Sequence, residues 1–204
     1  QQLRQRLELP ADARLIVYVG GMAPHKNLQG FLQGFSIARD KAAIDDIHVV
    51  LVGDYEGAGF HSNTGSLQQL ANQGSLKGAV HFTGFISDED LVVLYSDALA
   101  AAMPSFSEGF GLPAVEAMAC GTPVLSSNKG SLPEVVGDTG IYFDPYQIDS
   151  IAEAIIEMST DEDKRAQLAM LAAKRAASFI WPRAARLALD HLEALTSGSS
   201  RGRV

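Results

Sequence analysis

The sequence predicts a doubly wound α/β fold, with a parallel sheet of about six strands and helices on both faces. Two observations support this. Short apolar runs alternate with stretches of helical periodicity over the first 160 residues, and most of the apolar runs end at glycine or at turn residues. Because a parallel pair of strands cannot be joined by a tight hairpin, each helical stretch reads as a right-handed crossover.

The first elements follow that alternation closely. A strand is predicted at 14–21, where "RLIVYVGG" is rich in β-branched residues and stops at a glycine pair. A helix is predicted at 27–39, because apolar side chains recur there every three or four residues and Asn27 is available as an N-cap. The next strand and helix are predicted at 47–54 and 65–74.

The rest of the sheet is predicted in the same way. A strand at 79–85 precedes a helix that Ser87 opens as its N-cap, and Ser131 and Glu134 are expected to cap and charge a later helix. The remaining strands are predicted at 99–105, 122–127 and 140–144. The helix opened by Ser87 is predicted at 87–98, and the later helices at 112–119, 131–136 and 147–159.

The last part of the chain is alanine-rich helix at 161–180 and 182–196, with Pro182 well placed to open the second helix. These helices are expected to pack outside the sheet or to reach for a partner. We therefore divide the chain into a lead-in at 1–13, a ligand-binding domain at 14–196 and a flexible tail at 197–204. A first residue other than Met suggests a fragment of something longer.

Composition excludes several classes of protein. Hydrophobic residues make up 47% of the chain and charged residues 20%, and no window approaches the ~20 apolar residues of a membrane span. A net charge of -8 argues against a nucleic-acid partner held on a broad basic face. The single cysteine, Cys120, excludes an internal disulfide and gives no sign of a zinc site. A cytoplasmic location is expected.

Ligands of open α/β sheets bind at the carboxyl ends of the strands. This rule selects the loops at 20–27, 53–60, 84–87 and 105–112. In the last loop Gly109 and Gly111 allow backbone N–H groups to approach a ligand, and Pro113 suits the first position of the following helix. Glu108 is therefore expected in a loop at a helix entrance, where an anion or a hydroxyl-rich group is readily held.

Glu116 lies about one turn into that helix, among apolar neighbours. It does not complete a capping box: Pro113 as the cap has no backbone N–H for the glutamate to accept from, and with Leu112 as the cap the third position is Val115. An unpaired buried carboxylate would cost several kcal/mol, so hydrogen bonding to the hydroxyls of a ligand is the preferred interpretation over a structural role.

The segment "SEGFGLPAVEAMACGTPV" closely resembles the E-x7-E region of retaining glycosyltransferases of family 4, or glycosyl transferases group 1. In that family the segment belongs to the C-terminal, Rossmann-like, donor-binding half of a GT-B fold. "VYVGGMAPHKN", "VHFTGFISDEDLVVLYSDALAAMPS", "GSLPEVVGDTGIYFDP" and "FIWPRAARLAL" agree with other parts of the family, so the resemblance covers roughly residues 14–190.

The resemblance implies a role for each matching residue. Glu116 would hold the ribose hydroxyls of a nucleotide sugar, Glu108 would lie against the donor sugar, and Lys26 would neutralise the phosphates. We take Glu108 and Lys26 as the catalytic candidates. The donor-binding candidates, besides Glu116, are Phe110, Gly111 and Leu112 through their backbone amides, Gly109, Gly21, and Phe85 and Ile86 beside the base.

The implied reaction is transfer of a sugar to an acceptor hydroxyl with retention, through an oxocarbenium-like transition state. Lys26 and the amides at the helix start would stabilise the leaving diphosphate, so no metal or other cofactor is expected. The expected partners are a nucleotide-sugar donor, with mannose and guanine mildly preferred, and an N-terminal acceptor-binding half. That half could contact a membrane peripherally, and without it the fragment is expected to be inactive.

The sequence departs from the family at one place. Many members carry an arginine shortly before the lysine, where this chain has Gly20, Gly21 and Met22. Phosphate binding is therefore expected to be weaker or differently arranged. His25 is a candidate for partial compensation, although a loop histidine beside a lysine is more often simply solvated.

Other functions fit parts of the pattern. "GFGLPA" at 109–114 matches a dinucleotide fingerprint, but Ser126, Ser127, Asn128 and Lys129 stand where its acidic residue is needed. A glycosidase would need both glutamates to flank one bond. A GT-B sugar-nucleotide epimerase and a non-catalytic nucleotide-sugar-binding module remain as alternatives.

Overall fold

The computed structural model describes residues 2–54 and 64–198, with side chains described through residue 195. Its described strands form one parallel sheet in the order β3-β2-β1-β4-β5-β6. The strands are β1 Arg14–Val19, β2 Ile47–Val52, β3 Val80–Gly84, β4 Ala98–Met103, β5 Val124–Ser127 and β6 Gly140–Phe143. The predicted doubly wound sheet is confirmed.

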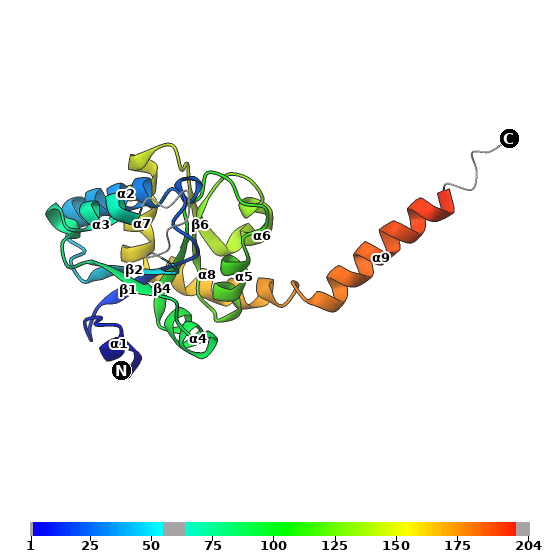
Figure 1. Ribbon diagram of the computed structural model, residues 1–204, viewed down its shortest axis with the longest axis horizontal. Coiled ribbons are helices and arrows are strands. Elements are labelled where there is room, and N and C mark those ends of the chain that lie inside the picture. The colour runs from blue at the N-terminus through cyan, green and yellow to red at the C-terminus, as the bar shows by residue number, and fades with distance from the viewer. Residues whose placement is uncertain (1, 55–63, 199–204) are drawn as a thin grey trace.

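Helices cover both faces of this sheet (Figure 1). One face packs against α2 Leu28–Ala42, α3 Thr64–Ala71 and α7 Ile148–Thr160. The other face carries α1 Gln2–Arg6, α4 Asp88–Ser96, α5 Leu112–Ala119, α6 Leu132–Val136 and α8 Glu162–Ala176. Short 3-10 turns are η1 Pro24–Lys26, η2 Gly74–Leu76 and η3 Gly137–Thr139.

The central strand explains why the strand pattern is easy to read. Alternate residues of β1 enter opposite cores: Ile16 and Tyr18 pack towards α2, whereas Leu15 and Val17 pack towards α4. A strand buried on both faces must be apolar along its whole length rather than at every second position. The predicted strand at 14–21 is therefore two residues too long, because Gly20 and Gly21 already belong to the loop.

Some expected helix starts differ from the structure. Asn27 occupies the predicted N-cap position of α2, but it has φ 53° and its side chain makes no capping hydrogen bond. Ser131 also precedes its helix without capping it, whereas Ser87 accepts a hydrogen bond from Asp90 N at 3.2 Å as predicted. Pro113 is the second residue of α5, not the first.

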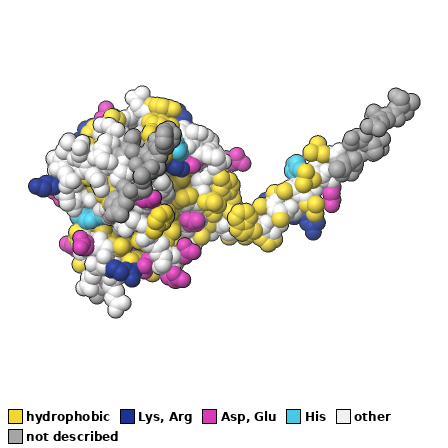
Figure 2. Space-filling view, in the orientation of Figure 1, with side chains coloured by type: hydrophobic (Ala, Val, Ile, Leu, Met, Phe, Trp, Pro, Cys, Tyr) yellow, Lys and Arg dark blue, Asp and Glu magenta, His cyan; other side chains and the backbone are white. Residues whose placement is uncertain are grey.

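The last helix leaves the body of the domain. α9 Trp181–Gly198 projects away from the sheet (Figure 1), so the first expected outcome, packing outside the sheet, does not hold for this helix. Hydrophobic side chains lie along its surface (Figure 2), and the exposed ones are Trp181, Leu187, Leu189, Leu192 and Leu195. The predicted tail at 197–204 lies for the most part outside the described residues.

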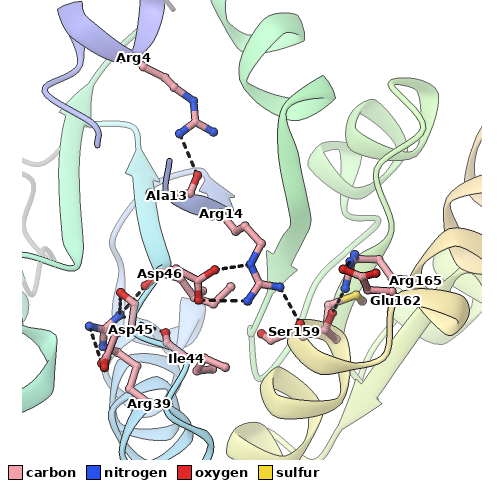
Figure 3. Close-up of polar contacts among 12 residues, drawn as sticks. Arg4, Ala13, Arg14, Arg39, Ile44, Asp45, Asp46, Ser159, Glu162 and Arg165 are labelled. Atoms are coloured by element: carbon pink, nitrogen blue, oxygen red, sulfur yellow. Dashed lines mark hydrogen bonds and ion pairs between the residues drawn. The ribbon is translucent and has the colours of Figure 1, made fainter. Parts of the chain in front are cut away.

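Arginines bind together the edge of the sheet where the strands begin (Figure 3). Arg14 donates to both carboxylate oxygens of Asp46, at 2.5 and 3.1 Å, and to the carbonyl of Ser159 at 2.7 Å. The hydrogen bonds from Arg14, and to a smaller extent its positive charge, hold the pKa of Asp46 below the ordinary value. Arg39 donates to the carbonyls of residues 45 and 47, at 3.1 and 2.6 Å. These contacts close this edge, although the buried Arg39 Nε and Ser159 Oγ have no hydrogen-bond partner among the described residues.

Candidate functional site

The candidate site lies where the loops after β1 and β4 diverge. These strands are neighbours at the centre of the sheet, but the chain leaves β1 towards β2 on one side and β4 towards β5 on the other. Phe106 N donates to His25 O at 2.9 Å, which joins the two loops directly. Such a switch point is where open α/β sheets bind ligands.

Lys26 and Glu108 meet at this point. Lys26 Nζ lies 2.7 Å from Glu108 Oε1, and the two side chains are only 23% and 14% exposed. The hydroxyl of buried Ser105 donates to the same carboxylate oxygen at 2.6 Å. The two catalytic candidates, 82 residues apart in the chain, are thus brought into one partly buried pair.

The backbone of Glu108 is fixed by the loop after β5. Ser131 Oγ donates to Glu108 O at 2.9 Å, which replaces the capping role expected for this serine. Gly130 has φ +63°, and a Cβ there would lie 3.0 Å from both Glu108 N and Glu108 O. A side chain at 130 would therefore be strained and crowded, and glycine lets the two loops touch.

The loop that carries Lys26 is held from both ends. Tyr18 Oη donates to Gly21 O at 2.6 Å, and Asn27 Nδ2 donates to Pro104 O at 3.2 Å and to Pro145 O at 2.9 Å. Burial, with a smaller effect from the charge of Glu108, raises the pKa of Tyr18, so its hydroxyl stays a donor. Gly21 is exposed, and nothing lies within 4 Å of a Cβ built there.

The glycine loop is open at one residue and packed at another. Gly109 is exposed with free space around it, whereas Gly111 is buried at φ +92° as the N-cap residue of α5. The Phe110 ring packs edge-on against Phe179, with ring centres 5.8 Å apart, so this side chain has a structural contact. Leu112 starts the helix and is half exposed, which corrects its predicted place in the loop.

Glu116 lies one turn inside α5, as predicted, and is exposed rather than buried. Partial desolvation, followed by the negative charge of Asp88 at the start of α4, raises the pKa of its carboxyl. Glu116 therefore faces the α4 side of the rim and has no hydrogen-bond partner among the described residues. It is not in contact with the pair formed by Lys26 and Glu108.

The two residues expected beside a base differ in exposure. Phe85 follows β3 with 82% of its surface exposed, whereas Ile86 packs partly against the core near α4. Both lie in the short connection between β3 and α4, whose first turn also carries Asp88. The candidates Glu116, Phe85 and Ile86 therefore share the α4 side of the site.

No group of three or more His, Cys, Asp or Glu side chains is placed to hold a metal ion in the part of the chain that the structure describes. Two Asp-x-Asp sequences occur, at 88–90 and 161–163. Both lie at helix starts, where Asp90 pairs with Arg6 and Asp161 accepts a hydrogen bond from Lys164 N at 2.9 Å. The contacts of Asp90 and Asp161 therefore give both sequences a structural role at the start of a helix.

Sequence reasoning missed Ser105, Tyr18 and the true role of Asn27. Ser105 had a readable signal, since it is a polar residue two positions after an alanine-rich strand and three positions before Glu108. The others had none, because their partners are carbonyl groups whose positions depend on the folded chain. Residues 55–60 of the predicted loop at 53–60 lie outside the described residues.

Comparison with known sequences identifies relatives. The chain is 37% identical over 165 residues to the O-antigen chain mannosyltransferase B of Escherichia coli, a match covering 81% of this chain and 42% of the relative. It is 32% identical over 204 residues to the D-inositol 3-phosphate glycosyltransferase of Corynebacterium jeikeium, covering 99% of this chain and 48% of that protein. The chain thus spans less than half the length of these relatives.

Solved structures agree on the fold. A sucrose-phosphate synthase from Thermosynechococcus elongatus matches with a TM-score of 0.77 and 30% identity, over 97% of this chain and 49% of the other. Anabaena HepE in complex with UDP matches with a TM-score of 0.81 and 25% identity, over 95% and 52%. The sequence pattern of the family described as glycosyl transferases group 1 matches residues 1–175. The chain belongs to the glycosyl transferases group 1 family.

Proposed function

We propose that this chain is the donor-binding half of a retaining glycosyltransferase that moves a sugar, with mannose favoured, from a nucleotide diphosphate to an acceptor hydroxyl. The observation that carries the proposal is the 2.7 Å pair of Lys26 and Glu108 at the switch point of the sheet. A cation and a carboxylate held together there suit a ligand that is anionic at one end and rich in hydroxyls at the other.

Each group has a role in this proposal. Glu116 accepts hydrogen bonds from the ribose hydroxyls, and its raised pKa reflects partial desolvation that such bonds would offset. Lys26 and the amides of the glycine loop stabilise the negative charge that develops on the leaving diphosphate. Glu108, fixed by Ser105 and Ser131, lies against the donor sugar. These fixed charges would stabilise the leaving diphosphate in place of a metal ion, so we propose that the transfer reaction does not require a metal.

The relatives support the donor class. One solved neighbour, Anabaena HepE, is described in complex with UDP and glucose, and it is 26% identical to this chain with a TM-score of 0.80. Several relatives from Escherichia coli are named mannosyltransferases. Since this chain spans about half of such proteins, we propose that an N-terminal half supplies the acceptor site and that the chain alone does not catalyse transfer.

Membrane contact is a separate part of the proposal. Among the described residues, no helix is both long enough and apolar enough to cross a bilayer. As a separate proposal, the N-terminal half makes peripheral contact with a membrane.

Calorimetric titration of this chain with GDP, UDP, ADP and their sugar derivatives tests the proposal. We expect binding of at least one nucleotide diphosphate, weakened about 10- to 100-fold in Lys26→Ala, since a charge-assisted hydrogen bond contributes about 1.5–3 kcal/mol. Glu116→Ala should weaken the binding of nucleosides and of nucleotides to the same extent, because it removes the proposed contact with the ribose hydroxyls.

One exposed lysine and one exposed glutamate elsewhere on the surface provide matched controls. Lys77→Ala and Glu153→Ala remove exposed residues on η2's flank and on α7, and should leave affinity unchanged. If the wild-type chain binds none of the nucleotides, or if Lys77→Ala weakens binding as much as Lys26→Ala, the donor site is misplaced. Retention would be tested on the longer protein, by the anomeric configuration of its product.

A further inference from the structure

A hollow opens beside the catalytic candidates, and neither of them belongs to its described lining. It has a volume of about 400 Å³ and is formed by η1, the start of α2, Phe106 and the turn before α7. Small-molecule sites commonly measure about 300–1,000 Å³, so this hollow, here called the η1 cleft, is large enough for a small ligand. Glu116, Lys26 and Glu108 are not among its lining residues.

The lining of the η1 cleft has a distinct chemistry. No charged side chain belongs to its described lining, which sets it apart from the neighbouring pair of Lys26 and Glu108. Among the described residues, this lining offers a diphosphate or another anion no counter-charge. The lining instead suits a neutral ligand.

Aromatic rings form one wall. Phe106 and Tyr146 stack with ring centres 4.8 Å apart and an interplanar angle of 19°, and Tyr146 is 64% exposed. Lys129 Nζ lies 5.9 Å from the Tyr146 ring centre and 3.6 Å from Asp144 Oδ1, so the ring position is fixed from outside the cleft. Stacked, accessible aromatic surface suits the C–H faces of a pyranose ring.

Amide groups form another wall. Gln29 and Gln33 lie one turn apart on α2, and both line the cleft. Neither side chain hydrogen-bonds to another described residue, and an amide offers both a donor and an acceptor, the combination that matches sugar hydroxyls. Gly30, between them, has no side chain to close the space.

The η1 cleft adjoins the candidate site. Asn27, which lines it, directly follows Lys26, and Phe106 stands two residues before Glu108 and is bonded to His25. We infer that the η1 cleft binds a neutral carbohydrate, namely one or two sugar units of the acceptor glycan beside the place of transfer. The identification of that carbohydrate as the acceptor rests on the proposed function, whereas sugar binding itself does not.

The test measures sugar binding to this chain without any nucleotide, by chemical-shift perturbation and saturation-transfer NMR. The probes are methyl α-mannoside, an α-linked mannobiose and maltose. We expect mannobiose to bind with a dissociation constant on the order of 1 mM, and Tyr146→Ala to weaken it about tenfold, the loss expected for one aromatic contact. Gln33→Ala should also weaken binding, and Tyr146→Phe should retain it.

Trp181→Ala is the matched control, because Trp181 is another exposed aromatic residue but lies on α9, outside the cleft. GDP titration of every variant separates the two proposals: Tyr146→Ala should leave nucleotide affinity unchanged. If no sugar binds while GDP does, or if Trp181→Ala and Tyr146→Ala weaken sugar binding equally, the η1 cleft inference is overturned. If the wild-type chain binds none of GDP, UDP and ADP, the donor site is overturned instead.

Discussion

The two edges of the sheet are built differently. Where the strands begin, Arg14 and Arg39 donate hydrogen bonds to carbonyls and carboxylates of the chain itself (Figure 3). Where the strands end, glycines bring loops close together, and Glu116 and the amides of Gln29 and Gln33 have no hydrogen-bond partner among the described residues.

The difference separates stability from binding. Polar groups satisfied within the chain contribute to the free energy of unfolding but have nothing left for a ligand. Polar groups left open at a rim contribute little to folding and are available for recognition. Substitutions at the two edges should therefore act on different measurements.

The largest expected effect is at the closed edge. Arg39→Ala should lower the free energy of unfolding by about 2–3 kcal/mol, because it removes a side chain that is only 10% exposed and leaves the partly buried carbonyls of Ile44 and Ile47 without this donor. Denaturant unfolding measures this. Lys41→Ala, on the same helix but in an exposed pair with Asp149, should change it by less than about 0.5 kcal/mol. Loss of nucleotide affinity in Arg39→Ala, in protein that is still folded, would contradict the separation.

An intermediate effect is expected at the open rim. Gly21 stands in the loop where many family members carry an arginine, and its surroundings are empty. Gly21→Arg should tighten GDP binding about tenfold through one added charge-assisted contact, with no loss of stability. Gly65→Arg adds the same charge on α3, where a side chain also has free space, and should not tighten binding. Equal changes in both variants would show a nonspecific effect of charge.

The smallest effect is a pH dependence at the β2 and β3 side of the sheet. His48 Nδ1 and His81 Nε2 share a hydrogen bond of 2.9 Å, and burial, then the charge of His48, lowers the pKa of His81 to about 4. The unfolded chain therefore binds more protons than the folded one between pH 6.5 and 4, and stability is lost as the pH falls through this window.

Denaturant unfolding at pH 7 and pH 4.5 should show a loss of about 1 kcal/mol attributable to this pair. His81→Asn should reduce that difference, whereas His191→Asn, at an exposed position on α9, should not. An unchanged pH dependence in His81→Asn would exclude the pair as its origin.

The sheet could be predicted because its strands are buried on both faces, which makes them continuous apolar runs bounded by glycine. Family membership could be predicted because the segment around Glu108 and Glu116 is long and specific, and the match to the family confirms it. The sequence places the loops of Lys26 and Glu108 at the same rim of the sheet. Their direct pairing was not predicted, because it depends on how the folded loops approach one another. The proposed roles of these residues towards a donor stay predictions.

Other features depend on tertiary contacts that no local pattern encodes. Asn27 looked like a cap but donates to Pro104 and Pro145, far away in the chain. The η1 cleft combines Gln33, Phe106 and Tyr146, whose spacing in the sequence gives no hint of proximity. The direction of α9 is likewise invisible to helical periodicity, which predicts an apolar face but not what lies against it.

The edge-on contact between Phe110 and Phe179 has a practical consequence for where the polypeptide is cut. Arg175, whose guanidinium lies 5.5 Å from the Phe179 ring centre, also donates to Val135 O at 2.8 Å, so the end of α8 supports both the glycine loop and α6. The family match ends at residue 175, before Phe179. A shortened protein that stops there would lose the neighbour of Phe110, whereas one that extends through Ile180 would keep it and dispense with the projecting helix.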